Sequence, residues 1–174
     1  MNKILSLAAV AGLSVVSLNA SAQNTYFELG YSQYMEDDAE LNVDMSIPML
    51  MGTVGYNVTD SFAVEGFLGM GVSEDTVTVY DVDVDAEINY IYGINLKASA
   101  NFTESFSGFA KLGYASTEVE VSVAGFGSES VDDSGTLFGA GLEYDFSESV
   151  YGTASYMGYN SDGGAFNIGV GMNF

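Results

Sequence analysis

The chain has 174 residues, enough for one domain, and carries 24 acidic residues against three lysines, with no histidine or cysteine. The formal charge of −21 excludes nucleic-acid binding, because almost nothing could neutralise phosphates, and the lack of cysteine excludes disulfides and thiol chemistry. Apolar residues make up 48% of the chain and are spread along it in alternation, which favours a sheet with one apolar face.

Residues 1–22 are predicted to be an export signal. Lys3 supplies the positive start, Ile4 to Leu18 form an apolar run, and Ala20-Ser21-Ala22 gives a small-x-small cleavage pattern. A transmembrane anchor is the alternative, but the run is shorter than the roughly 20 residues that a spanning helix needs. We therefore expect cleavage between Ala22 and Gln23, leaving residues 23–174 as one domain.

A short turn recurs every 44 residues along this domain, at 59–62, 103–106 and 147–150. The three copies read Thr-Asp-Ser-Phe, Thr-Glu-Ser-Phe and Ser-Glu-Ser-Val. Three tight turns joining pairs of strands account for six strands, and one strand before the first turn and one after the last return make eight.

Apolar and polar residues alternate in the strands between these turns. In 88–102 every even position is apolar, from Ile88 to Phe102, and 62–72 and 138–146 follow the same rule. The second and seventh strands match less well, and Tyr151 and Met157 leave the facing of the seventh open. A soluble β-sandwich also alternates. However, apolar faces of about nine to eleven residues, with aromatics beside the turns, are typical of membrane barrels. We predict an eight-stranded, antiparallel, up-and-down transmembrane β-barrel, which leaves no unpaired edge in lipid.

The connections opposite the tight turns are long and acidic, and strands three to six are expected to project from the membrane there. Asp81, Asp83 and Asp85 resemble the start of a calcium loop, but the glycine and the distal glutamate of such a loop are missing. Weak divalent-cation binding is the sharper hypothesis, and a solvated acidic loop is the preferred interpretation. No other metal and no cofactor is predicted.

Few charged residues are expected to face the barrel interior. Lys97 and Lys111 lie seven residues on either side of Glu104, so they should be neighbours on adjacent strands. Carboxylates should balance this pair, and the inward-facing candidates are Glu28, Glu65 and Glu143. The preferred interpretation is an ion-pair network that fills the narrow lumen of eight strands. A gated ion path and catalysis by paired carboxylates are the alternatives.

The last strand carries the most specific local pattern. Asn167-x-Gly169-x-x-Met172-x-Phe174 resembles the signature by which the barrel assembly machinery recognises its substrates. Together with the export signal and the eight strands, it makes the chain similar to the small outer-membrane β-barrel superfamily. That superfamily includes the transmembrane domain of outer-membrane protein A and the small adhesion and serum-resistance barrels.

The resemblance implies a monomer in the outer membrane, surrounded by lipid and lipopolysaccharide and assembled by that machinery. Members act as structural proteins, adhesins or narrow pores, whereas the enzymes that resemble this fold use a histidine, which is absent here. We expect a structural or surface-interaction role that presents acidic extracellular loops to a surface ligand or divalent cations. The alternative is a narrow cation-preferring channel.

Overall fold

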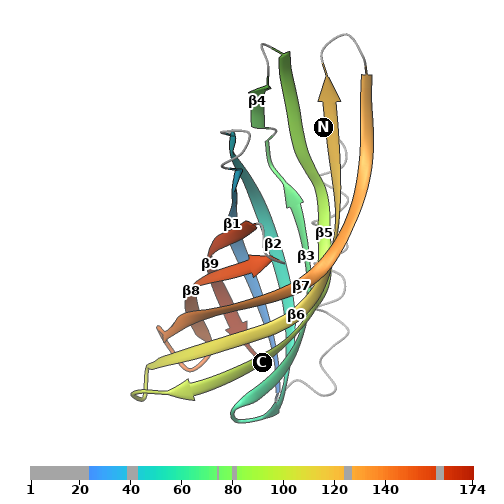
Figure 1. The fold of residues 1–174 in the computed structure, drawn as a ribbon. Coiled ribbons are helices and arrows are strands. Elements are labelled where there is room, and N and C mark those ends of the chain that lie inside the picture. Colours follow the sequence, from blue (N-terminus) through green and yellow to red (C-terminus); the bar gives the residue numbers. More distant parts are fainter. Residues whose placement is uncertain (1–23, 39–42, 74, 80–81, 124–126, 160–162) are drawn as a thin grey trace.

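The computed structural model describes residues 24–38, 43–73, 75–79, 82–123, 127–159 and 163–174. Cleavage at Ala22 and Gln23 therefore falls outside the described residues. The described part of the chain is almost entirely β-strand (Figure 1). Its strands are β1 (Thr25–Asp38), β2 (Val43–Thr59), β3 (Phe62–Gly71), β4 (Asp75–Val79), β5 (Val82–Asn101), β6 (Phe106–Val123), β7 (Gly127–Asp145), β8 (Val150–Tyr159) and β9 (Gly163–Asn173).

These strands form one closed antiparallel barrel. Apart from β3 and β4, each strand pairs with its neighbours in sequence order, and β1 also pairs with β9. β3 and β4 both pair with β5, so together they make up one strand of the barrel, interrupted after Gly71. The predicted eight-stranded up-and-down barrel is confirmed. None of the described segments forms a helix long and apolar enough to cross a membrane.

The three tight turns lie where the 44-residue repeat predicts them, at the lower end of the barrel in Figure 1. In the first turn the Thr59 hydroxyl accepts hydrogen bonds from the backbone N–H groups of Ser61 and Phe62, at 3.3 and 3.1 Å. Ser147 repeats this arrangement with Ser149 and Val150, at 3.4 and 3.1 Å. In the middle turn Thr103 accepts from Ser105 at 3.3 Å. The repeated Ser/Thr thus closes each turn locally.

The repeat extends to side-chain packing beside two of the turns. The ring of Phe102 covers Gly108, where a Cβ would meet Phe102 Cζ at 2.7 Å. The ring of Phe146 covers Gly152 in the same way, because a Cβ at Gly152 would meet Phe146 Cε2 at 2.9 Å. Each aromatic reaches across its hairpin onto a glycine of the next strand. The two hairpins are therefore copies in packing as well as in sequence.

A band of large apolar side chains surrounds the outside of the barrel. Ile94 is 65% exposed and Leu96 is 60% exposed, whereas the residues that alternate with them, Asn95 and Lys97, are buried in the lumen. A water-soluble sandwich would cover such a band. Other members are Leu29, Leu50, Val54, Phe62, Val64, Leu68, Leu112, Phe138, Leu142, Ile168 and Val170.

The outward face predicted for the fourth strand is wrong at Ile88. This side chain is only 4% exposed and packs inside the barrel with Ile47 and Met49. The reason is a register shift between Ile88 and Tyr90, where Asn89 has no partner on β6. One extra residue in a strand reverses the faces on either side of it. On β8, the open question is answered: Tyr151 and Met157 both face the lumen.

The barrel is uneven in height. β5, β6 and β7 have 20, 18 and 19 residues, whereas β8 and β9 have 10 and 11. Together with β4, the long strands extend well beyond the others at the end opposite the tight turns (Figure 1). We call this the loop end, and the opposite one the turn end.

Candidate functional site: the barrel lumen

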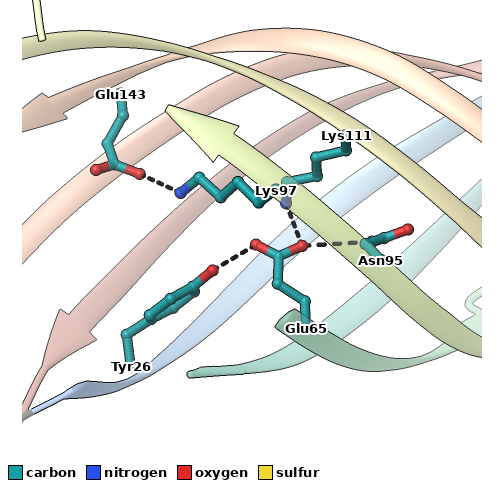
Figure 2. A network of polar contacts seen from close by, with 6 residues as sticks. All are labelled: Tyr26, Glu65, Asn95, Lys97, Lys111 and Glu143. Carbon is teal, nitrogen blue, oxygen red and sulfur yellow. Dashed lines mark hydrogen bonds and ion pairs between the residues drawn. The ribbon is translucent and has the colours of Figure 1, made fainter. Parts of the chain in front are cut away.

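Charged side chains from four strands meet in the lumen near the turn end. Lys97 of β5 and Lys111 of β6 are direct partners across the hairpin. Both project into the space where Glu65 of β3 and Glu143 of β7 lie (Figure 2). The equal spacing of the lysines from the turn brings them together, because residues equidistant from a tight hairpin turn face each other. We call these four residues the ion-pair network.

Each lysine of the ion-pair network has its own carboxylate. Lys97 Nζ lies 2.7 Å from Glu143 Oε2, and Lys111 Nζ lies 2.8 Å from Glu65 Oε2. Glu65 is 1% exposed and is well supplied with donors. The Tyr26 hydroxyl donates to its Oε1 at 2.7 Å, and Asn95 Nδ2 donates to its Oε2 at 3.3 Å (Figure 2). A buried carboxylate is tolerated when its lone pairs are satisfied in this way.

Aromatic rings offset the repulsion between the two ammonium groups. Phe109 lies near both, with its ring centroid 4.7 Å from Lys97 Nζ and 5.1 Å from Lys111 Nζ. Tyr26 and Tyr151 add two further rings near Lys97, at 5.2 and 5.9 Å. Ring faces attract cations, and more strongly where water is excluded. The network and these rings together occupy the lumen at this height.

Glu28 lies beside the two ion pairs without joining either of them. Within the described chain, no ammonium group lies within ion-pair distance of its carboxylate. Its Oε1 instead lies over Gly169, beside the hydroxyl of Thr153: a Cβ at Gly169 would meet these oxygens at 2.8 and 2.9 Å. The sequence correctly placed Glu28 in the lumen, but the structure does not join it to a lysine.

A cavity of about 280 Å³ lies in the lumen between the network and the loop end. Its floor includes Glu28, Asn95 and Lys111, and its upper part is lined by Tyr34, Asp133 and Tyr159. Its walls are mostly apolar, from Ile47, Met49, Met51, Phe67, Ile88, Ile91, Val119, Leu137 and Met157. Sequence reasoning missed this cavity. Ile88 was assigned to the wrong face, and the alternation of the second strand, which carries three of these residues, was weak.

The acidic cluster of the second loop is described only in part. Asp81 lies outside the described residues, while the backbones of Asp83 and Asp85 pair with Thr78 and Thr76 of β4. Among the residues that the structure does describe, no three acidic, histidine or cysteine side chains are gathered to hold a metal ion. Cation binding by this loop stays a prediction.

The pattern in the last strand divides between the two faces of β9. Asn167 lines the lumen cavity, and Gly169 leaves the space that Glu28 and Thr153 occupy. Met172 and Phe174 face outward, both about half exposed. The backbone N–H of Phe174 donates to the carbonyl of Thr25 at 3.0 Å, beside the β1–β9 seam. Gly169 therefore has a packing role, whatever part it plays in assembly.

A family profile described as the outer membrane protein beta-barrel domain matches residues 5–174. No curated protein matches the chain in sequence. Several solved barrels share the fold at low identity. The attachment invasion locus protein Ail of Yersinia pestis, solved with the heparin analogue sucrose octasulfate, is 19% identical, with a TM-score of 0.63 over 87% of this chain and 98% of Ail.

Two other barrels align over similar lengths. The N-terminal β-barrel domain of OprF from Pseudomonas aeruginosa is 17% identical, with a TM-score of 0.63 over 87% of this chain and 98% of that domain. The neisserial surface protein A is 14% identical, with a TM-score of 0.59 over 86% of this chain and 97% of that protein. At these identities the likeness concerns the fold alone.

Proposed function

The chain belongs to the outer membrane protein β-barrel family, and from this premise we propose that its loop end binds cationic partners at the cell surface. The partner class is a basic protein surface or divalent cations. The barrel itself anchors the acidic loop end at the membrane surface and has a structural role. The observation that carries the proposal is the separation of charge between the inside and the outside of the barrel.

All the positive side chains of residues 23–174 are inside. This segment contains every acidic residue of the chain and only two cationic residues, Lys97 and Lys111, both in the ion-pair network. At the loop end the exposed carboxylates include Glu129 and Asp132. A surface of one sign attracts partners of the other sign and repels its own, over a range of about 10 Å at 0.1 M salt.

The same charge argument predicts that this barrel and Ail bind ligands of different charge. Ail has been solved with a sulfated heparin analogue, and sulfate groups require cationic or N–H donors. This chain has no arginine or histidine, and both lysines beyond the predicted signal are held by carboxylates in the lumen. A similar fold is therefore proposed to serve a partner of opposite charge.

A narrow cation-preferring channel is the alternative function. Its support is the excess of carboxylates in the lumen, where Glu28 stands beside two balanced ion pairs. Against it stands the filling of the lumen by the network, Phe109 and Tyr151, since eight strands leave room for little beyond side chains. A catalytic role gains no support from Glu65 and Glu143, because each is held by a lysine.

A binding experiment with matched charge removal tests the proposal. The protein in nanodiscs of neutral lipid is titrated with a ten-residue lysine peptide and, separately, with heparin, at low and at high salt. We expect salt-sensitive binding of the peptide and none of heparin. The loop-end variant Glu120→Gln/Glu129→Gln/Asp132→Asn should weaken peptide binding several-fold.

The matched control removes three charges at the turn end. Asp60→Asn/Glu104→Gln/Glu148→Gln changes the equivalent residue of each tight turn, and all three side chains are exposed. This variant should bind the peptide as the parent does. If both triple variants lost the same peptide affinity, the binding would depend on net charge and not on the loop end. Heparin binding would contradict the proposal. Steady cation-selective conductance in a planar bilayer would favour the channel.

A further inference from the structure

We propose that the lumen cavity binds a small aliphatic amine, with the ammonium head at the floor beside Glu28 and the apolar chain extending toward the loop end. The cavity measures about 280 Å³ and is closed below by the ion-pair network. It is thus a blind pocket inside the barrel and not a path through it. The inference is independent of the partner proposed for the loop end.

The walls select the body of the ligand. Ile47, Met49 and Ile88 form one buried apolar cluster, and Phe67 and Leu137 belong to a second that also lines the cavity. Water in such surroundings finds few polar partners, so an apolar ligand displaces it favourably. An apolar cavity of about 150 Å³ accepts a benzene molecule. A cavity of 280 Å³ therefore has room for a chain of about six carbons.

The floor selects the head of the ligand, because it offers acceptors without free donors. Both ammonium groups are engaged by Glu143 and Glu65, and Glu28 has no ion-pair partner among the described residues. Asn95 is 7% exposed, and its Oδ1 accepts no hydrogen bond while its Nδ2 is engaged by Glu65. Glu28 and Asn95 both line the cavity. A primary ammonium group has three N–H donors and one positive charge, and so it matches the Glu28 carboxylate and the Asn95 Oδ1.

The charge at the upper part of the cavity has the same sign. Asp133 lines it there and is exposed. Carboxylates at both ends of a low-dielectric space raise the local concentration of cations and lower that of anions. A carboxylate ligand of the same length would meet Glu28 and Asp133 with like charge. An alcohol would bring one donor and no charge. The expected order of affinity is amine, then alcohol, then carboxylate.

Methionine methyl groups provide the reporter for a binding experiment. Met49, Met51 and Met157 line the cavity, whereas Met172 faces outward from β9. The protein, labelled with 13C at its methionine methyls and held in lipid nanodiscs, is titrated with hexylammonium, hexanol and hexanoate. We expect saturable shifts at the three cavity methionines and none at Met172. If the shifts at Met172 matched those at the cavity methionines and did not saturate with added ligand, the amine would only be partitioning into lipid. This result would overturn the proposal.

Two variants separate the roles of head and chain. Glu28→Gln should weaken hexylammonium binding at least tenfold and leave hexanol binding unchanged. Val119→Phe places a ring in the cavity and should abolish binding of both, whereas Leu112→Phe on the outer face of the same strand should abolish neither. Equal binding of amine and carboxylate, or no effect of Glu28→Gln, would overturn the proposal even if Val119→Phe fails to fold.

Discussion

The two halves of the lumen are built from the same strands and differ in almost every other respect. Toward the turn end, the interior is filled by Lys97, Lys111, Glu65 and Glu143 with aromatic rings around them. Toward the loop end, it is hollow and mostly apolar, with a cavity of about 280 Å³. The outer face is apolar at both heights, as Leu96 and Leu50 illustrate.

The contrast shows which features of the barrel the lipid constrains and which it does not. Lipid requires an apolar outer face and a fully paired backbone, and both halves meet these conditions. The inner face is constrained only by the small volume that eight strands enclose. One half fills this volume with balanced charge and the other leaves it as a cavity. The predictions below compare variants of the two halves by urea unfolding in lipid vesicles, read from the gel mobility of unboiled samples.

Removing one buried charge of the filled half should have the largest effect. Glu65→Leu leaves the Lys111 ammonium without a partner in a site where Glu65 itself is 1% exposed. Breaking a buried pair from one side costs about 3–5 kcal/mol. Glu65→Leu/Lys111→Met should recover most of this loss, because neither charge remains. Glu28→Gln, at the floor of the hollow half, should change stability by less than about 1 kcal/mol, since it breaks no ion pair. A cost as large as that of Glu65→Leu would place Glu28 in the network.

Two buried phenylalanines provide a matched pair for packing. Phe109 contacts both lysines in the filled half, and Phe67 lines the cavity in the hollow half. Truncation of a buried phenylalanine to alanine costs about 3–5 kcal/mol. We expect Phe67→Ala to fall at the lower end of this range, because Phe67 already borders a cavity, and Phe109→Ala to cost about 1 kcal/mol more, because it also loses contacts with two cations. Equal losses would mean that the rings contribute only through packing.

Two glycines test how tightly the barrel is packed where the two halves of the lumen meet. A Cβ at Gly113 would collide with Asn95 Oδ1 and with the backbone carbonyl of Ile94, whereas a Cβ at Gly66 on the outer face meets nothing within 4 Å. Gly113→Ala should therefore destabilise the barrel by about 1–2 kcal/mol through overpacking. Gly66→Ala should leave the urea midpoint unchanged, and a comparable loss there would point to a backbone effect instead.

The tight turns should show the smallest effects. Ser147→Ala removes the acceptor for two backbone N–H groups, at 3.4 and 3.1 Å, and should cost about 1 kcal/mol. Thr103→Ala should cost less, because Thr103 accepts one bond at 3.3 Å. Ser149→Ala, in the same turn as Ser147, serves as the control and should be neutral. A loss at Ser149 equal to that at Ser147 would contradict the role assigned to the repeated hydroxyl.

The sequence predicted the barrel well because its two strongest signals are local. The 44-residue spacing marks the turns, and the alternation between them marks the faces, so the strand count and the pairing of Lys97 with Lys111 follow. The cavity could not be predicted, because the alternation of β2 is weak and the faces of β5 depend on one unpaired residue, Asn89. The side chain of Asn89 donates to Glu118 at 2.9 Å, a contact between two strands that no binary pattern encodes. Past this residue the faces of β5 are reversed, and Ile88 turns inward.

The 44-residue repeat has a consequence for how such a barrel can change in evolution. The covering of Gly108 by Phe102 recurs, one repeat length further along the chain, as that of Gly152 by Phe146. A hairpin is therefore a packing module, and its duplication would add two strands to the barrel. Membrane barrels with even strand numbers from 8 upward form such a series. Duplication of one hairpin within the gene would therefore give a wider barrel, whose lumen a single ion-pair network could not fill.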